Sequence, residues 1–406
     1  MLTVLFTVPG RLTAQTAPLF ESRWKIALPD GPSARAAFDA THAYIPLRSG
    51  KLTAIGLNDG KTLWTVDAPS SWAPATGQGL LFVAHENEIV ARDATDGHQR
   101  WRVLLDHPLA IAPLFDTGWL FVGSEDGVIV ALRAVDGVVL WKLDVGSRVV
   151  AQPAPAGMSV YLALSDGRIV AVDLNSGTEA WTRQLATPTS GILALDDRMF
   201  VGTEDNYFYC LALKDGSIKW RWRTGGDIVG DPIVDEARVF FLSLDNVLRA
   251  LDRRSGSQQW LQAIPSRTIG GPFRSGSLII VATLSPQLQA FHSADGKPAG
   301  SSPAPQGDDL STTLAAPPQQ VSLDGHDAFV LLTRQGVLEL QAVITEEPPT
   351  KQKQVSQREA GVPLSTRTAR ANRAIPSTMR AAGVPENASR INRRLGDSTK
   401  KAAPAT

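Results

Sequence analysis

A tryptophan recurs along this chain at a fixed distance from a tight-turn signal, and this repeat constrains the fold more than any other feature. In each copy a glycine follows Asp or Ser, and the tryptophan stands four residues after the glycine, as in Asp136, Gly137 and Trp141. Successive tryptophans are 37 to 40 residues apart, which indicates one structural unit repeated many times. The pairs are Gly60 and Trp64, Gly97 and Trp101, Gly137 and Trp141, Gly177 and Trp181, Gly216 and Trp220, and Gly256 and Trp260.

Each repeat unit has the pattern of four short strands. In the unit that contains Trp181, apolar stretches at 149–156, 159–165, 168–174 and 179–185 are separated by turn signals at Gly157, Gly167 and Gly177. Four antiparallel strands about every 40 residues are typical of a β-propeller blade. Because one blade cannot bury both faces of its sheet, the blades must stack around an axis.

The number of units predicts eight blades. A seventh unit has Gly296 in its turn but Gly300 where tryptophan is expected, and three more strands follow, near 310–317, at 328–333 and at 337–343. The missing fourth strand is predicted at 21–28, because Trp24 precedes Trp64 by 40 residues with no turn before it. The sequence therefore predicts an all-β, eight-bladed propeller over 18–344, made of four-stranded antiparallel blades and closed by pairing the N-terminal strand into the last blade.

The repeated residues are expected to be structural. Glycine takes the left-handed conformation that a tight hairpin needs, and the indole offers a flat surface suited to the gap between blades. Cys210, the only cysteine, occupies the small-residue position six before Gly216, so we expect it to be buried rather than reactive. The predicted structural tryptophans are Trp24, Trp64, Trp101, Trp141, Trp181, Trp220 and Trp260.

The two ends of the chain differ from the repeat region. At 1–17, an apolar run from Leu2 to Val8 precedes small residues and resembles the end of a secretory signal without its basic region, so we expect a truncated signal and export. This segment has no cysteine that could act as a lipobox residue. At 345–406 the chain has 12 Lys/Arg and 5 Asp/Glu and is rich in Pro, Ala, Ser and Arg, so a disordered basic tail is expected. Two interpretations of this tail stay open, a tether for an acidic partner or anionic surface, and a solvated segment.

Charge and motif content exclude several classes of function. With 40 basic and 40 acidic residues the net charge is zero, which argues against nucleic-acid binding. The chain has no P-loop, no dinucleotide-binding glycine motif and no hydrolase nucleophile motif, and its six histidines lack metal-ligand spacing. We therefore predict no catalytic residue, no metal site, no cofactor, no nucleic-acid partner and no transmembrane span.

One face of the predicted propeller offers candidate binding residues. Loops from the second to the third strand of a blade share a face with loops from the fourth strand to the next blade, and the latter carry Arg148 and Arg267, five residues before Pro153 and Pro272. Asp227 likewise stands five residues before a proline, Pro232. These three are the candidate partner-binding residues, since arginine is favoured at binding hot spots; an ordinary solvated loop face is the alternative. The second-to-third loops carry Glu86, Glu88, Glu125, Asp126, Asp166, Glu204, Asp205 and Asp245.

The general pattern of the repeat is a small residue, an apolar residue, three residues of any type, Asp or Ser, Gly, three residues of any type and then Trp. This pattern resembles the pyrroloquinoline-quinone-like propeller repeat over roughly residues 20–343. Two groups share this repeat. The quinoprotein dehydrogenases carry a vicinal cysteine pair and a calcium–quinone site in long inserted loops, and this chain has neither the pair nor such inserts. In length and blade count the chain resembles the BamB-type outer-membrane assembly factors.

The resemblance to BamB-type factors implies a periplasmic lipoprotein without a catalytic site, whose loops dock onto the membrane barrel assembly machinery. Arg148, in "GSRVVAQP", is the nearest candidate for that contact. We therefore expect a monomeric, non-enzymatic, protein-binding scaffold of the cell envelope that is periplasmic and outer-membrane associated. A quinoprotein-dehydrogenase-like enzyme and a ligand-sensing propeller module remain as alternatives.

Overall fold

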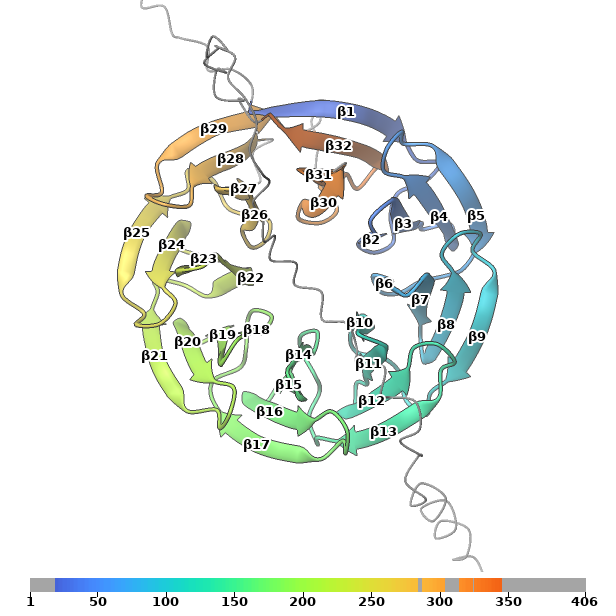
Figure 1. The fold of residues 1–406 in the computed structure, drawn as a ribbon, viewed down its shortest axis with the longest axis horizontal. Helices are drawn as coiled ribbons and strands as arrows, with labels where there is room; N and C mark the ends of the chain where they lie inside the picture. The colour runs from blue at the N-terminus through green and yellow to red at the C-terminus, as the bar shows by residue number, and fades with distance from the viewer. Residues whose placement is uncertain (1–18, 284–286, 304–313, 324, 345–406) are drawn as a thin grey trace, which may run out of the picture. The chain divides into compact units, whose positions relative to one another are not determined.

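A computed structural model describes residues 19–283, 287–303, 314–323 and 325–344 of the chain. The expected signal at 1–17 and the expected basic tail at 345–406 lie outside these residues. All regular elements of the described residues are strands, which form eight four-stranded antiparallel sheets arranged as blades around one axis (Figure 1). The prediction of an eight-bladed, all-β propeller is therefore confirmed.

The first four blades follow the chain in order, each from its innermost to its outermost strand. Blade 1 has β2 (Ala37–Phe38), β3 (His42–Pro46), β4 (Lys51–Gly56) and β5 (Thr62–Asp67). Blade 2 has β6 (Ala75–Gly77), β7 (Leu80–His85), β8 (Glu88–Asp93) and β9 (Gln99–Leu104). Blade 3 has β10 (Leu114–Asp116), β11 (Trp119–Gly123), β12 (Val128–Arg133) and β13 (Val139–Asp144). Blade 4 has β14 (Ala154–Ala156), β15 (Ser159–Ala163), β16 (Arg168–Asp173) and β17 (Glu179–Gln184).

The next three blades repeat this order, and the last one does not. Blade 5 has β18 (Leu193–Leu195), β19 (Arg198–Thr203), β20 (Tyr207–Ala212) and β21 (Ile218–Arg223). Blade 6 has β22 (Ile228–Val234), β23 (Arg238–Ser243), β24 (Val247–Asp252) and β25 (Gln258–Ala263). Blade 7 has β26 (Phe273–Ser275), β27 (Leu278–Ala282), β28 (Gln287–His292) and β29 (Pro298–Pro303). Blade 8 has β30 (Gln319–Leu323), β31 (His326–Leu332) and β32 (Val337–Val343), with β1 (Phe20–Ala27) as its outer strand.

The ring closes where the first strand meets the last. β1 runs antiparallel to β32 from Phe20 opposite Val343 to Ala27 opposite Val337, with a bulge between Ser22 and Trp24 (Figure 1). The strand predicted at 21–28 is therefore the outer strand of the eighth blade.

The innermost strands are shorter than the sequence pattern predicted, or displaced from it. Of the strand predicted near 310–317, residues 310–313 lie outside the described residues, and 314–317 form no strand but only an isolated bridge from Leu314 to Thr333. The inner strand of blade 8 is β30, which starts after Pro317 and Pro318. In blade 4 the predicted stretch 149–156 reduces to β14, which follows Pro153. Proline has no N–H to donate to a strand ladder, so Pro153 separates β14 from the isolated bridge of Val149 with Leu164.

The core lies between blades, because the two middle strands of each blade are buried on both faces. In β12, for example, Ile129 to Leu132 are all nearly inaccessible, and alternate residues contact opposite neighbouring blades. Burial on both faces explains why these strands read as continuous apolar runs rather than as alternating patterns.

A contact between a tryptophan and a glycine turn joins each blade to the next, and we call it the Trp–Gly contact. Trp141 Nε1 in the outer strand of blade 3 donates a hydrogen bond to the Leu174 carbonyl of blade 4 at 2.7 Å. The indole also covers Gly177, where a Cβ would lie only 2.5 Å from the Trp141 ring. Gly177 has a φ of +66°, so both the turn and the ring require glycine.

The same contact occurs seven times around the ring. In each case the carbonyl acceptor stands three residues before the covered glycine of the following blade. The donor and acceptor pairs are Trp24 and Leu57, Trp64 and Ala94, Trp101 and Ala134, Trp141 and Leu174, Trp181 and Leu213, Trp220 and Arg253, and Trp260 and Ser293.

The missing tryptophan at Gly300 follows from the ring closure. A tryptophan at position 300 in β29 would have to cover a turn between the third and fourth strands of blade 8. Those strands are β32 and β1, which are the two ends of the ring. No such turn exists, so there is no glycine and no carbonyl to receive an indole. Leu19 lies there instead, 3.7 Å from where a Gly300 Cβ would be.

We predict that deletion of residues 20–28 destabilises the whole ring and not one blade. The deletion removes the β1–β32 pairing and the Trp24 contact together, and a loss of about 5 kcal/mol or more would match the entire stability of many domains. Thermal unfolding followed by circular dichroism should show the loss, and a synthetic peptide of the deleted sequence should restore part of it. An unchanged midpoint would contradict the closure.

Two glycines with the same backbone conformation allow a matched test of the Trp–Gly contact. Gly157→Ala should cost about 1 kcal/mol, because Gly157 has a φ of +63° but nothing lies near its would-be Cβ. Gly177→Ala should cost about 3 kcal/mol, because the methyl group also displaces Trp141. Urea denaturation measures both values. Equal losses would mean that the indole moves aside without cost.

Candidate functional site

The loops of the propeller fall on two faces with different sequence behaviour. One face, which we call the turn face, has the turns that join the first two and the last two strands of each blade, including all turns of the Trp–Gly contacts. The other, which we call the loop face, has the hairpins between the second and third strands and the connections from one blade to the next. The candidates Arg148, Asp227 and Arg267 lie on connections that lead into blades 4, 6 and 7.

Arg148 is exposed and bridges two neighbouring blades weakly. Its guanidinium lies 3.4 Å from Glu125 Oε2 in the hairpin of blade 3, and its carbonyl accepts a hydrogen bond from Ser165 N in the hairpin of blade 4. Both side chains of the ion pair are about half exposed, so solvent screens the attraction. The Arg148 charge therefore remains available to a partner.

Arg267 and Asp227 lie on adjacent connections, and Arg148 lies two blades from Asp227. Arg267 is exposed, and within the described ranges it has no ion-pair partner. Asp227 is half-buried, and its carbonyl accepts a hydrogen bond from Leu244 N at 2.8 Å. No hydrogen bond or ion pair between these three residues occurs in the part of the chain that the structure describes. They form separate points on the face and not one cluster.

Several carboxylates of the loop face hold their own hairpins. Asp126 and Asp245 accept hydrogen bonds from the hydroxyls of Ser124 and Ser243, two residues earlier, at 2.5 Å each. Asp205 accepts one from Thr203 in the same way. The pattern of Ser or Thr, any residue, then Asp at the hairpin could have been found in the sequence.

Other acidic residues of this face are also partnered. Asp166 Oδ2 lies 2.7 Å from Arg168 Nε, and Glu204 Oε1 accepts a hydrogen bond from the Thr187 hydroxyl at 3.0 Å. Glu88 is part of β8 and pairs with Arg102. Most of the acidic rim is thus structural, although the exposed Glu86 has no ion-pair partner among the described residues.

Asp245 is the most strongly held carboxylate of the loop face. Its oxygens lie 2.5 Å from Arg249 Nη2 and 3.0 Å from Gly225 N, which belongs to the connection that leads into blade 6. Burial would raise the pKa of this carboxyl, but the hydrogen bonds from Arg249 and Ser243 outweigh burial and lower the pKa to about 2.

A cavity of about 1010 Å³ lies between the inner segments of blades 1 to 6 and blade 8, and we call it the axial cavity. Among its lining residues only Arg35 and Asp231 are charged, and Asp231 accepts a hydrogen bond from Gly191 N of the neighbouring blade at 2.9 Å. Gln152 donates to the Pro113 carbonyl at 3.3 Å. The other lining residues are mostly small or apolar, so the cavity has room for a ligand but few groups to orient one.

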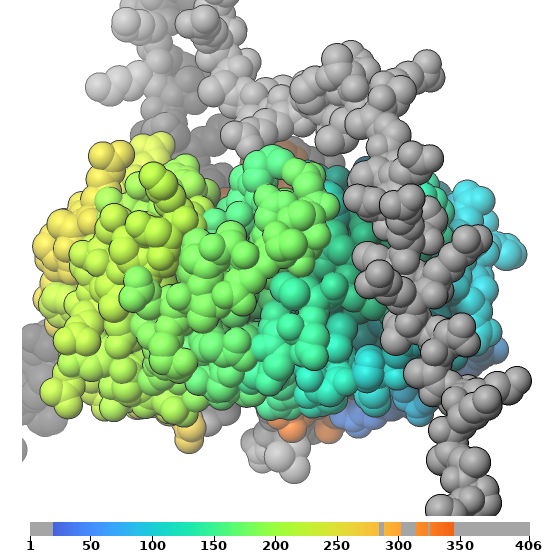
Figure 2. Space-filling view, turned by 90° about the horizontal axis from the view of Figure 1, so that it is seen from below, coloured from blue at the N-terminus to red at the C-terminus, as the bar shows by residue number. Residues whose placement is uncertain are grey.

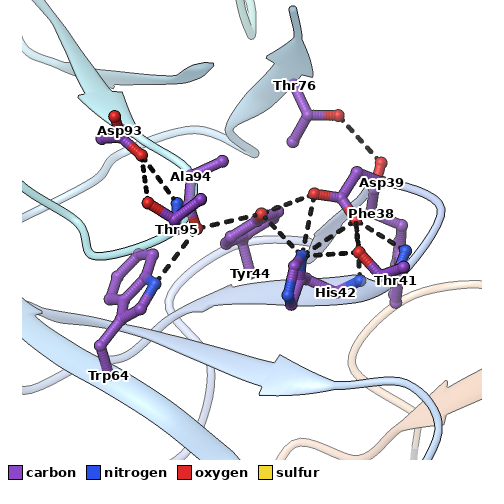
Figure 3. A network of polar contacts seen from close by, with 10 residues as sticks. All are labelled: Phe38, Asp39, Thr41, His42, Tyr44, Trp64, Thr76, Asp93, Ala94 and Thr95. Carbon is purple, nitrogen blue, oxygen red and sulfur yellow. Dashed lines mark hydrogen bonds and ion pairs between the residues drawn. The ribbon is translucent and has the colours of Figure 1, made fainter. Parts of the chain in front are cut away.

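The densest polar network is on the turn face and joins blade 1 to blade 2 (Figure 3). The Asp39 carboxylate accepts hydrogen bonds from Thr41 N, His42 N and the Tyr44 hydroxyl, the last at 2.6 Å. The Ala94 carbonyl of blade 2 accepts from both the Tyr44 hydroxyl and Trp64 Nε1.

The titration of this network fits a structural role. Burial alone would raise the pKa of Asp39, but hydrogen bonds from Tyr44, Thr41 and His42 lower it below its ordinary value. Burial and the bond to Asp39 raise the pKa of the Tyr44 phenol above its usual range, so the phenol stays protonated and donates. Burial likewise raises the pKa of the Cys210 thiol to about 11, and Cys210 lies directly opposite Trp220 in the strand ladder.

The described residues contain no group of three or more His, Cys, Asp or Glu side chains placed to hold a metal ion. No helix formed by them is long and apolar enough to cross a membrane.

We predict that Asp245→Asn destabilises the protein by about 2 kcal/mol at neutral pH, from the lowered pKa. A lowered pKa stabilises the fold above the ordinary value of 3.8, and this contribution is lost as the pH falls from 3.8 towards about 2. The difference between the variant and the parent should therefore vanish over that window, as urea denaturation at several pH values would show.

Glu86→Gln is the matched control, since Glu86 is an exposed carboxylate of the same face. It should change stability by no more than about 0.5 kcal/mol at any pH. An Asp245→Asn effect that persists unchanged at the lowest pH would contradict the assignment.

Comparison with known proteins adds a family and a fold to this geometry. A family profile described as outer membrane protein assembly factor BamB matches residues 48–195 and 165–363. The outer membrane protein assembly factor BamB of Yersinia pestis is 22% identical over 315 residues, which is 70% of this chain and 79% of that protein.

Solved structures share the propeller fold at lower identity. BamB from Moraxella catarrhalis superposes with a TM-score of 0.66 at 16% identity, over 81% of this chain and 98% of that chain. A quinohemoprotein alcohol dehydrogenase from Comamonas testosteroni superposes with a TM-score of 0.63 at 14% identity, over 87% of this chain and 80% of that chain. At these identities the two likenesses establish the fold and nothing finer.

Proposed function

Because this chain belongs to the family of the outer membrane protein assembly factor BamB, we propose that it is a non-enzymatic scaffold of the cell envelope that binds a protein partner through its loop face. The partner would be a component of the machinery that assembles outer-membrane barrels. The chain would act in the periplasm, associated with the outer membrane.

The observation that carries this proposal is the difference between the two faces. On the turn face the repeated residues are occupied by the seven Trp–Gly contacts, so this face has little freedom to change. On the loop face the connections differ from blade to blade, and Arg148 and Arg267 are exposed with a weak partner or none among the described residues. Exposed arginines on a rigid ring are suited to recognise carboxylates of a partner.

The axial cavity fits a quinone enzyme poorly. A quinone cofactor of the pyrroloquinoline type is a polyanion, and its site needs several cationic side chains or a metal ion. Arg35 is the single cation among the residues that line the axial cavity. We therefore regard a quinoprotein enzyme as a weaker candidate function than protein binding. A ligand-sensing role would also depend on this cavity, and its small apolar lining suggests no particular ligand.

A capture experiment from envelope extracts tests the proposal. The parent protein should retain a barrel-assembly component identified by mass spectrometry, and Arg148→Glu or Arg267→Glu should reduce its capture about tenfold or more, because a reversed charge repels the partner's carboxylates. Arg254→Glu is the matched control, since Arg254 is an exposed arginine of the turn face.

Two outcomes would count against the proposal. If neither loop-face variant loses the partner, the assignment of the face fails. If titration of the parent protein with quinone and calcium gives a bound-quinone absorbance shift, the enzyme alternative is favoured instead.

A further inference from the structure

The outer strand of blade 5 carries a row of three cations. In β21, Lys219, Arg221 and Arg223 stand at alternate positions and all are exposed. Alternate residues of a strand point to the same side, with about 7 Å between successive side chains. The row is therefore an ordered line of positive charge on the outer wall of the ring.

No carboxylate of the described residues lies within ion-pair distance of these three cations, and Asp215, in the turn before β21, attracts Lys219 from further away. Cations at the matching positions of two other outer strands are ion-paired. In β9, at the positions that match Lys219 and Arg221, Arg100 lies 2.8 Å from Asp93 and Arg102 lies 2.5 Å from Glu88. Lys142 in β13 lies 2.6 Å from Asp106.

Two tyrosines of the neighbouring strand β20, Tyr207 and Tyr209, lie beside the row. The Arg221 guanidinium lies 4.8 Å from the centre of the Tyr207 ring, and the Tyr207 and Tyr209 rings are 5.8 Å apart. Tyr209 donates a hydrogen bond to Asp205 at 3.1 Å, which fixes this tyrosine to its hairpin. Stacking on tyrosine orders the guanidinium before any partner arrives, and arginine with tyrosine is the composition enriched at binding hot spots.

The positive strip is only one strand wide. At the matching positions the strand before it, β17, has Ala180, Thr182 and Gln184, and the strand after it, β25, has Gln259, Leu261 and Ala263. Figure 2 views the wall from the side on which β17 and β21 lie in Figure 1, and the green and yellow-green surface of blades 4 to 6 faces the viewer there. The strip is therefore narrow, and the neighbouring strands are uncharged at the matching positions.

We propose that Lys219, Arg221 and Arg223 form a docking site for an acidic, extended segment of a protein, with carboxylates at every second residue. An extended chain presents alternate side chains with the same spacing as the cation row, so three carboxylates can face three cations at once. Arginine also binds carboxylates through two parallel hydrogen bonds, which gives register as well as affinity.

A lipid surface fits this strip less well than an extended acidic chain does. Recognition of anionic bilayers typically uses about four to eight cations near the surface, whereas this strip has three in a single line, with uncharged residues at the matching positions of both neighbouring strands. The site is on the side wall, with Arg223 at its loop-face end, and it does not depend on the proposed function.

Binding of a synthetic peptide with glutamate at every second position tests the proposal. The full-length protein should bind this peptide, measured by fluorescence anisotropy, and should not bind a peptide with glutamine in place of glutamate. The double variant Lys219→Gln/Arg221→Gln should weaken binding about tenfold or more.

The double variant Arg100→Gln/Arg102→Gln makes the same chemical change at the matching positions of β9, where both cations already have carboxylate partners. It should leave peptide affinity within about twofold of the parent, since ion-paired cations offer little extra attraction. Circular dichroism melts of both variants establish that they are folded.

Three results would overturn the proposal. The first is an equal loss of peptide affinity in the two double variants. The second is binding of phosphatidylglycerol vesicles that depends on Lys219 and Arg221 while the peptide does not bind. The third is unchanged peptide affinity combined with new self-association of Lys219→Gln/Arg221→Gln, which would mean that the row only prevents edge strands of two copies from pairing.

Discussion

The ring depends on the Trp–Gly contact between each blade and the next. The contact combines burial of a flat indole against a glycine turn with one hydrogen bond from the indole to a backbone carbonyl of the next blade. Because blades follow one another around a circle, each blade from the first to the seventh receives an indole from the blade before it, and blades 1 to 6 also give one to the blade after. A blade cannot shift without breaking contacts on both sides, so the frame is rigid where these contacts lie.

The turn face, the loop face and the outer wall differ in how many of their side chains are already held by contacts within the ring. On the turn face the indoles cover the glycine turns, and the polar network around Asp39 and Tyr44 adds a further link between blades 1 and 2. On the loop face many carboxylates are held inside their own hairpins, as Asp245 is by Arg249 and Ser243. Exposed cations with a weak ion-pair partner, or with none among the described residues, include Arg148 and Arg267 on the loop face and the row of β21 on the wall. A chain with no net charge thus presents such cations in defined places.

The sequence predicted the fold well because the determining signals are local. Gly177 and Trp181 are four residues apart, and their repetition gives both the blade and the count. The position of Trp24 without a turn was enough to place the closing strand. The short inner strands were harder to predict, because one proline such as Pro153 interrupts the pairing.

The site was less predictable because it depends on which side chains meet across blades. Nothing near Asp245 in the sequence shows that Gly225 donates to it, and the partnering of Arg102 with Glu88 is equally hidden. The row in β21 is visible as "KWRWR", but only the structure reveals that none of its cations lies within ion-pair distance of a carboxylate among the described residues.

The closure of the ring also sets an order of events during synthesis. β1 is the first strand of the ring to leave the ribosome, and its only strand partner, β32, is the last. Until the end of the chain emerges, β1 has no permanent neighbour in its own sheet, and its apolar side chains Phe20 and Trp24, which pack into two different clusters of the finished ring, stay uncovered. Such an unpaired strand is prone to wrong pairing and aggregation. A protein of this design therefore benefits from a chaperone that holds the early strand apart while the blades between are completed.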